Sequence, residues 1–282
     1  MTNILITGAT GFIAQYIVKE LAMYPELNLT VASRNIVKLQ SIFDKHIKTV
    51  VIDINKPKKS WFKKCNQPDA IIHLAWGELN NFKSAIHITQ ELPNHLHFLN
   101  TMIQDGVKHI LVSGTCLEYG LTNGKLTENI HTNPTTAYGI AKDSLRKCLQ
   151  IICAEQQCQL TWLRYFYIYG KGQSPKTLLA QLETSIKNKS PEFKMSKGEQ
   201  LRDYLPVETV AKYTAKIFKA QIDGIINVCS GSAISINQLV ENKKLELNSN
   251  IKLNKGFYKY PDYEPMAFWG DTTKLNKIIN KA

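Results

Sequence analysis

The chain has 282 residues, 44% of them hydrophobic, and a formal net charge of +12. This length suits one large α/β domain, alone or with a smaller lobe, and no apolar run is long enough to predict a transmembrane helix. The charge favours an anionic partner. However, only four of the 35 basic residues are arginine, the usual reader of bases and phosphates, so neither nucleic acid nor a membrane is expected as a partner.

Strands and helices are predicted to alternate along the first 165 residues. Short apolar runs predict six strands, at residues 3–7, 29–32, 49–52, 70–74, 109–112 and 160–165. Helical patterns fall between them, at residues 12–22, about 35–43, 84–104 and 136–156. This alternation predicts an α/β fold of the Rossmann type, a doubly wound parallel sheet covered on both faces. Ligands of such sheets bind at the carboxyl ends of the strands.

A glycine-rich loop, GATGFIA at residues 8–14, follows the first predicted strand. Gly8 ends the strand and Gly11 opens the helix, so backbone can approach a pyrophosphate at the helix N-terminus. Ala14 replaces the usual third glycine, which mainly permits close helix packing. A tight turn without a ligand is the alternative. The context of the loop favours a dinucleotide site that includes Gly8, Thr10, Gly11, Phe12 and Ile13.

The end of the second predicted strand indicates which dinucleotide binds. An acidic residue there would bind the ribose 2′-hydroxyl of NAD, but Ser33 and Arg34 occupy this place. An arginine would meet a 2′-phosphate, so NADP(H) is favoured and NAD(H) remains possible; an exposed loop cation is the alternative for Arg34. Asp53 and Ile54, after the third strand, are candidates for the adenine end, with an ordinary turn as the alternative for Asp53.

The segment AYGIAK at residues 137–142 carries the catalytic signal. Tyr138 and Lys142 are four residues apart on a predicted helix and therefore share a face. A free phenol titrates near pH ~10, and a neighbouring ammonium would stabilise its phenolate. Thr115, in VSGTCLEYG after the fifth strand, is well placed to polarise a substrate oxygen. Together with the glycine loop, these residues predict acid–base chemistry next to a dinucleotide.

In these motifs the chain resembles the extended short-chain dehydrogenase/reductase family of nucleotide-sugar epimerases, dehydratases and 4-ketoreductases. Further motifs follow in the family's order, almost to the end of the chain: IIHLAW, LRYFYIYGKGQ, LRDYLPVETVA, GIINVCSGSAISINQLV and FWGDTTKL. The resemblance implies that Tyr138 is the general acid/base, that Lys142 holds the nicotinamide ribose, and that Thr115 binds the sugar oxygen. It also implies cofactor contacts from Leu74, Ala75, Trp76, Ser113 and Tyr165.

The resemblance implies a nucleotide-diphosphate sugar as the substrate. Its candidate contacts are Cys116, Glu118, Tyr167, Lys171 and Arg202, the last toward the diphosphate; a structural cap is the alternative for Glu118. The family also implies a Rossmann domain formed by residues 1–165 and 201–228, a substrate lobe formed by residues 166–200 and 229–282, and a homodimer through the helices at 84–104 and 136–156.

The residues after Thr115 distinguish branches of the family. A 4,6-dehydratase would need an acid–base pair there, typically Asp-Glu, but Cys116 and Leu117 occupy these positions. The cysteine of a GDP-fucose-synthase-type enzyme would stand one residue later than Cys116. Together with Ser33-Arg34 and the compact length, this favours an NADPH-dependent reductase of a dTDP- or CDP-linked 4-keto-6-deoxy sugar in surface-polysaccharide biosynthesis. A nucleotide-sugar 4-epimerase with retained NAD is the alternative.

No metal site is expected. None of the six cysteines forms a CxxC pair, so they are interpreted as buried or half-buried free thiols in a reducing compartment. His95 and His97 lie two residues apart on a predicted helix and point in different directions, so they are interpreted as helix-face or interface residues. The chain opens on a strand-like segment rather than a signal peptide, and a cytoplasmic location is expected.

Overall fold

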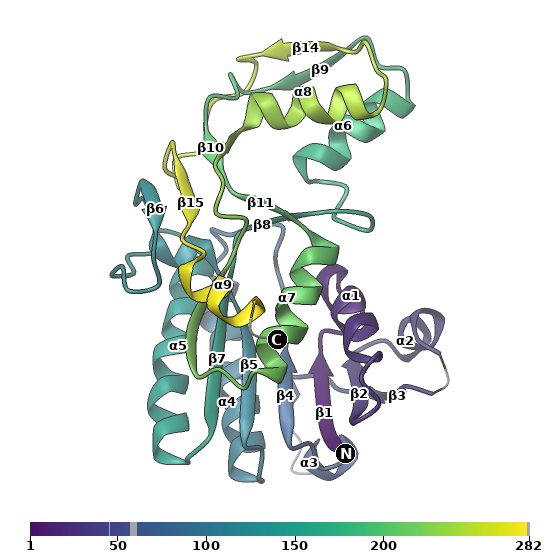
Figure 1. The fold of residues 1–282 in the computed structure, drawn as a ribbon, viewed down its shortest axis with the longest axis vertical. Coiled ribbons are helices and arrows are strands. Elements are labelled where there is room, and N and C mark those ends of the chain that lie inside the picture. Colours follow the sequence, from purple (N-terminus) through teal and green to yellow (C-terminus); the bar gives the residue numbers. More distant parts are fainter. Residues whose placement is uncertain (45, 57–60, 281–282) are drawn as a thin grey trace.

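The computed structural model describes residues 1–44, 46–56 and 61–280. Within this part of the chain, a parallel seven-stranded sheet has the order β12-β7-β5-β4-β1-β2-β3 (Figure 1). Its strands are β1 (Thr2–Thr7), β2 (Leu27–Ser33), β3 (Lys48–Val51), β4 (Ala70–His73), β5 (His109–Thr115), β7 (Gln159–Tyr165) and β12 (Gly224–Val228). The order runs outward in both directions from the β1/β4 pair, where a doubly wound sheet binds ligands. The predicted fold class is therefore confirmed.

Helices cover both faces of the sheet because alternate strand residues point to opposite sides. In β1, Ile4 and Ile6 join the core under α1 (Phe12–Leu21) and α7 (Val207–Lys219), whereas Leu5 joins the opposite core. That second core packs under α4 (Leu92–Gln104) and α5 (Ala137–Glu155). Two shorter helices, α2 (Ile36–Ile42) and α3 (Trp61–Lys64), lie in the connections of β2 and β3. Each apolar stripe thus packs against one face of the sheet.

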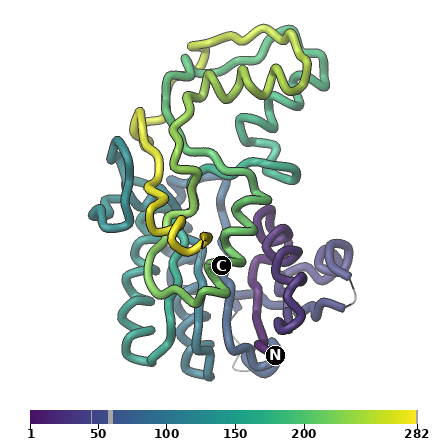
Figure 2. The backbone as a smooth tube through the Cα atoms, viewed as in Figure 1, coloured from purple at the N-terminus to yellow at the C-terminus, as the bar shows by residue number. Residues whose placement is uncertain are grey.

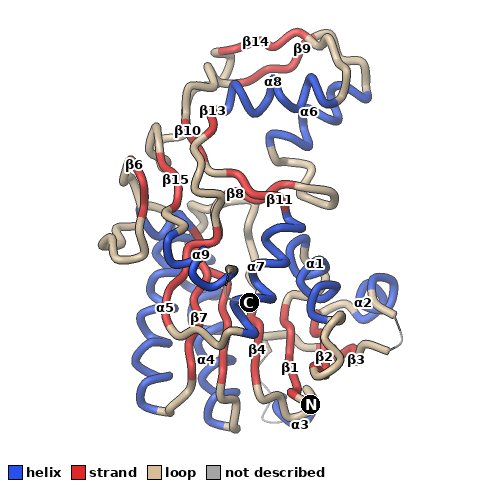
Figure 3. The backbone as a smooth tube through the Cα atoms, viewed as in Figure 1, coloured by secondary structure: helices blue, strands red, loops and turns tan. Residues whose placement is uncertain are grey.

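A smaller lobe stands above the carboxyl ends of the strands (Figure 2). Its elements are α6 (Leu178–Lys187), β9 (Glu192–Met195), α8 (Ile236–Glu246) and β14 (Lys252–Lys255), which share a separate small core. Short strand pairs join it to the main sheet (Figure 3). These pairs are β8 (Tyr167–Tyr169) with β11 (Tyr204–Pro206), and β10 (Leu201–Arg202) with β13 (Ile234–Ser235).

The end of the chain leaves the lobe, in contrast to the expectation that the lobe extends over residues 229–282. Strand β15 (Phe268–Gly270) pairs with β6 (Gly124–Leu126), and α9 (Thr273–Ile279) follows it back to the main sheet. Leu275 and Ile278 are buried in the same core as Ile4 and Ile6, because α9 is amphipathic and covers α7 and β12. Residues 281–282 lie outside the described part of the chain.

Three smaller findings bear on the sequence predictions. The helix expected at residues 84–104 begins with a π-helical turn, η1 (His87–Glu91), before α4. The free cysteines are confirmed: five are buried, and Cys148 is half-buried. Across the described residues, no helix has the length and apolar character needed to cross a membrane.

Candidate functional site

A cavity of about 580 Å³ lies at the carboxyl ends of the strands, under the lobe. All the residues predicted to contact the cofactor line it, from Gly8 in the glycine loop to Tyr165 at the end of β7. Three further predicted residues, Thr115, Cys116 and Tyr167, line it as well. The structure thus brings the cofactor and catalytic candidates together around one space.

The glycine loop fits the pyrophosphate of a dinucleotide. Gly8 has a φ of +69°, and a Cβ there would lie 2.6 Å from the backbone nitrogen of Ala75. Only glycine therefore lets the loop cross the segment that follows β4. Gly11 caps α1 without a side-chain hydrogen bond, and the first turn of α1 holds no acidic residue. The positive end of this helix is thus available to an anion.

The adenosine end of the cavity lies at the ends of β2 and β3. The Ser33 hydroxyl lies 3.1 Å from that of Thr10, while the exposed Arg34 reaches the cavity wall. Asp53 lines this end and accepts a hydrogen bond from the backbone N–H of Asn55 at 3.2 Å. The cation predicted near the ribose is therefore at the cavity, in the place where NAD enzymes of this fold carry an acid.

The catalytic candidates meet at the opposite end of the cavity. Tyr138 lies in the first turn of α5, whose cap, Thr136, accepts a hydrogen bond from Gly139 N–H at 3.0 Å. Burial raises the pKa of Tyr138, and the neighbouring Thr115 side chain opposes this effect. The phenol is consequently neutral, and both side chains line the cavity.

Lys142 is 1% exposed, and its ammonium donates to the Ser113 carbonyl oxygen at 2.9 Å. It lies 3.9 Å from the ring centre of Trp76 but 6.0 Å from that of Tyr138. Burial lowers the pKa of Lys142 to about 7, against the effects of the Glu118 and Glu91 carboxylates. The stabilisation of the phenolate by Lys142 stays a prediction; in this structure the ammonium lies closer to the Trp76 ring than to the Tyr138 ring.

Two ring side chains that no sequence motif indicated, Phe82 and His87, pack against Tyr138. Phe82 stacks on the Tyr138 ring at 5.2 Å, and its carbonyl oxygen accepts from Tyr138 N–H at 3.0 Å. His87 contacts the same ring at 5.2 Å. Phe82 comes from the irregular segment between β4 and α4, which has no periodic pattern that could have placed it over the site.

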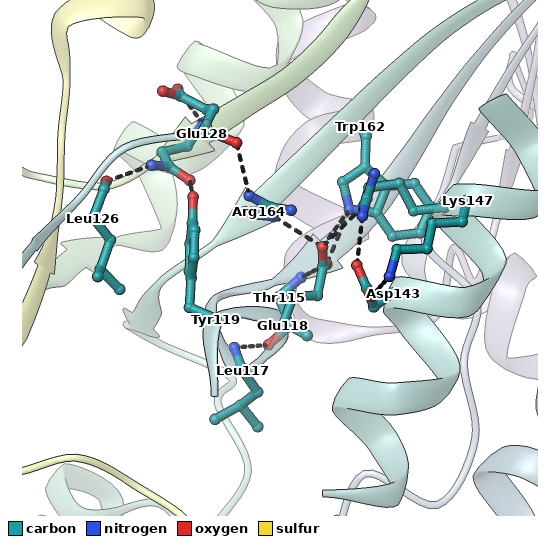
Figure 4. A network of polar contacts seen from close by, with 12 residues as sticks. Thr115, Leu117, Glu118, Tyr119, Leu126, Glu128, Asp143, Lys147, Trp162 and Arg164 are labelled. Atoms are coloured by element: carbon teal, nitrogen blue, oxygen red, sulfur yellow. Dashed lines mark hydrogen bonds and ion pairs between the residues drawn. The ribbon is translucent and has the colours of Figure 1, made fainter. Parts of the chain in front are cut away.

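Glu118 is fully buried and does not line the cavity (Figure 4). Its carboxylate accepts hydrogen bonds from Thr115 N–H, Trp162 Nε1 and Arg164 Nε, each at 2.9 Å. Arg146 Nε lies 3.6 Å away. The structure thus gives Glu118 the alternative role of a structural cap rather than a substrate contact, because donors from β5 and β7 enclose its carboxylate.

Arg202 does not line the cavity either. It is 1% exposed, and its guanidinium donates to Glu264 at 2.9 Å and to the Leu201 carbonyl oxygen at 2.8 Å. Glu264 lines the cavity in its place and accepts from the Tyr167 hydroxyl at 2.6 Å. The predicted diphosphate contact of Arg202 is therefore screened by a carboxylate that sequence reasoning missed, because Glu264 lies 62 residues away in the chain.

Lys171 also lies away from the cavity, in contrast to its predicted substrate contact. Its side chain is exposed, and its carbonyl oxygen accepts from the Tyr16 hydroxyl at 2.8 Å. The neighbouring glycines, Gly170 and Gly172, have φ values of +148° and +91°, and the chain turns here. As a result, the polar residues that reach the cavity come two to six positions later: Gln173, Ser174 and Thr177.

Two more residues on the wall were not predicted to lie there, Glu91 and His95. His95 was interpreted as a helix-face residue, but it is 3% exposed and hydrogen-bonded to both His73 and Glu91. Glu91 and His95 are four residues apart at the junction of η1 and α4, so they share a side of the helix and form an ion-pair contact. The contact of His95 with His73, 22 residues earlier in the chain, is what a helical pattern could not reveal.

Comparison with known proteins gives consistent results. The NAD dependent epimerase/dehydratase family matches residues 4–229. A dTDP-6-deoxy-L-talose 4-dehydrogenase (NAD(+)) of Aggregatibacter actinomycetemcomitans is 28% identical over 274 residues, which cover 95% of this chain and 99% of that protein. UDP-arabinose 4-epimerase 1 of Arabidopsis thaliana is 26% identical over 320 residues, with 99% of this chain and 75% of that protein covered.

The fold is similar to solved structures of 4-epimerases. UDP-glucuronic acid 4-epimerase from Bacillus cereus, in complex with UDP-glucuronic acid and NAD, superposes with a TM-score of 0.86 at 20% identity, covering 100% of this chain and 94% of that one. UDP-glucose 4-epimerase from Thermotoga maritima, with UDP-glucose, has a TM-score of 0.82 at 21% identity, with coverages of 98% and 92%.

Proposed function

The chain belongs to the NAD dependent epimerase/dehydratase family, and we propose that this NAD-dependent enzyme interconverts the 4-hydroxyl and 4-keto forms of a dTDP-linked 6-deoxyhexose. The observation that carries the proposal is that Tyr138, Thr115 and Lys142 line the same cavity as the glycine loop. The near full-length match to a 4-dehydrogenase of a dTDP-6-deoxyhexose supports this substrate class.

The proposed chemistry assigns one role to each residue. The nicotinamide exchanges a hydride with C4 of the sugar when it is bound. Tyr138, neutral because it is buried, gives its proton to the 4-oxygen during reduction and takes it back during oxidation. Thr115 donates a hydrogen bond to that oxygen as its negative charge develops. Lys142, which lies on α5 and donates to the Ser113 carbonyl oxygen near the carboxyl end of β5, holds the ribose of the cofactor.

The residues after Thr115 support simple oxidation and reduction rather than dehydration. Burial raises the pKa of the Cys116 thiol, so the thiol stays protonated at neutral pH. Leu117 has no titratable group. A dehydratase would need a proton donor and acceptor at these two positions, and neither side chain fits that role.

NAD(H) is the proposed cofactor, because the 4-dehydrogenase relative carries NAD(+) in its name and the epimerase from Bacillus cereus binds NAD. The preference for NADPH predicted from Ser33 and Arg34 has no support among these relatives. The exposed Arg34 guanidinium lies on the cavity wall, where a 2′-phosphate would lie, and it favours binding of NADP(H) as a second cofactor.

Replacing Arg34 separates the two cofactors. Arg34→Ala should weaken NADPH binding about tenfold and NADH binding at most about twofold, because only NADPH carries a phosphate that a guanidinium can bind through charge-assisted hydrogen bonds. Fluorescence titration of the purified protein with each reduced cofactor measures both dissociation constants. Equal losses for the two cofactors would contradict this role of Arg34.

The direct test is turnover of a defined sugar nucleotide. With dTDP-6-deoxy-L-talose and NAD, the protein should produce NADH, measured at 340 nm, and a 4-keto product identified by mass spectrometry. With the 4-keto sugar and NADH it should run in reverse. Interconversion of 4-epimers without net change in NADH would instead establish the alternative, a 4-epimerase with retained NAD.

Three predictions about the cellular context accompany the proposal. The enzyme is expected in the cytoplasm, in the synthesis of a surface polysaccharide, and as a homodimer through α4 and α5. Large apolar side chains are exposed on this region, Ile88 on η1 and Ile140 and Ile151 on α5. Size-exclusion chromatography with light scattering measures the state of association.

A further inference from the structure

Glu91 places a negative charge at the catalytic end of the cavity. Among the described residues that line the cavity, the formally charged side chains are Arg34, Asp53, Glu91, Lys142 and Glu264. Glu91 is the lining carboxylate that acts electrostatically on Lys142. Its position is tightly defined, because Gly77 N–H donates to its Oε2 at 2.8 Å and a Cβ on Gly77 would lie 2.6 Å from its Oε1.

A buried chain of hydrogen bonds holds this carboxylate. His95 Nε2 lies 3.0 Å from Glu91 Oε2, His73 Nε2 lies 2.7 Å from His95 Nδ1, and the Thr7 hydroxyl lies 2.9 Å from His73 Nδ1. Because a carboxylate only accepts, His95 Nε2 must donate to it. It follows that His73 donates to His95, and that Thr7 donates to His73. Each of these three hydrogen bonds therefore has a defined donor and acceptor, and Glu91 is the final acceptor.

The hydrogen-bonded group of Thr7, His73, His95 and Glu91 carries one net negative charge, which is located on Glu91. Burial lowers the pKa of His73 well below its ordinary value, and electrostatic interactions with His95 and Lys142 lower it further. Burial also lowers the pKa of His95, although Glu91 opposes this effect. Burial raises the pKa of Glu91, but the hydrogen bonds from His95 and Gly77 outweigh it and lower the pKa overall.

The surroundings of Glu91 connect it to the catalytic residues. His95, which binds Glu91, stacks on Trp76 at 4.6 Å with an interplanar angle of 23°. The Lys142 ammonium lies over the same indole, and the Tyr138 ring contacts its edge at 6.1 Å. Glu91 and Lys142 are therefore opposite charges in the part of the cavity where hydride transfer takes place.

We propose that Glu91 is a positioning and charge-tuning residue that makes the enzyme bind the oxidised cofactor relatively more tightly than the reduced one. The oxidised nicotinamide ring carries a positive charge and the reduced ring carries none. A fixed carboxylate in this buried site therefore stabilises the oxidised ring, and it offsets the repulsion from Lys142. The inference rests on the proposed function only in placing the nicotinamide ring next to Tyr138.

The test is Glu91→Gln with NAD and NADH as separate probes. Both hydrogen bonds to Glu91 end on Oε2, so the single amide oxygen of glutamine can accept both while the charge is removed. The dissociation constant of NAD should rise about tenfold and that of NADH should change less than about twofold. Calorimetry for NAD and fluorescence for NADH give the ratio without any sugar, so a failure of the proposed sugar chemistry leaves this result interpretable.

Two control variants separate charge from shape. Glu264→Gln removes the cavity carboxylate that binds Tyr167 and Arg202, and it should leave the NAD/NADH affinity ratio unchanged. His95→Gln keeps the charge of Glu91 but disturbs its support, and it should weaken both cofactors to a similar extent. If Glu91→Gln does not give folded protein, Glu91→Asn replaces it in the same titrations. Equal weakening of NAD and NADH by the glutamine or asparagine variant, or no change in either, would overturn the proposal.

Discussion

Tyr138→Phe is expected to reduce turnover by roughly 10² or more, the scale of losing a positioned general acid. The variant keeps the aromatic ring, so the stacking on Phe82 and the edge contact with Trp76 remain. Only the phenolic hydroxyl is lost. NADH binding and the melting temperature should therefore stay close to those of the native protein, while the steady-state rate with a dTDP-4-keto-6-deoxyhexose falls.

Thr115→Val is the matched comparison for this loss. It removes one hydrogen bond to the developing negative charge but leaves the proton donor in place, so its cost should be smaller than that of Tyr138→Phe. A native rate in the Tyr138→Phe enzyme would show that another group supplies the proton. Because the Thr115 hydroxyl also accepts from Leu117 N–H at 3.2 Å, the melting temperature of the valine variant must be measured alongside its rate.

Glu118→Ala should be among the most destabilising substitutions in the chain. It removes the carboxylate that bonds Trp162 and Arg164 and leaves the Arg164 guanidinium, 1% exposed, without its charge partner. Removing one member of a buried ion pair costs about 3–5 kcal/mol in the free energy of unfolding. Urea denaturation followed by circular dichroism measures this difference.

An exposed glutamate on the neighbouring helix gives the control for this substitution. Glu155→Ala, at the end of α5, should change the free energy of unfolding by less than about 0.5 kcal/mol. If Glu118→Ala changed the free energy of unfolding as little as the control does, water or a rearranged side chain would have to hydrogen-bond the Arg164 guanidinium instead. Loss of activity beyond the loss of folded protein is also expected, because Glu118 fixes the backbone N–H of the catalytic Thr115.

The sheet and its helices could be predicted because each element repeats a simple pattern. Strand β4 appears as an apolar run and α5 as a helix that begins at the cap residue Thr136, and both depend mainly on nearby residues. The same holds for Gly8 and Gly11, whose loop sits at a fixed place after the first strand. Patterns formed by residues close together in the sequence therefore predicted the part of the cavity that includes the glycine loop.

The substrate end depends on contacts between distant parts of the chain. Arg202 was expected to face a diphosphate, but its guanidinium is bound by Glu264, which the return of the chain from the lobe brings beside it. Glu118 had two possible roles, and only the burial of Trp162 and Arg164 around it decides between them. Glu91 lines the cavity from η1, where it accepts from Gly77 N–H, 14 residues earlier in the chain, and no periodicity indicates this contact in advance.

The return of β15 and α9 to the main sheet also affects the order in which the protein can be completed. The core under α7 includes Leu275 and Ile278, which the ribosome adds after the whole lobe. The core that β1, α1 and α7 share is therefore incomplete until α9 has been made, even though β1 is made long before it. During synthesis β12 lacks its final cover, and chaperones would meet an exposed apolar edge there. Strand β1 and helix α9 thus depend on each other in folding, although Thr115, Tyr138 and Lys142 all lie between them.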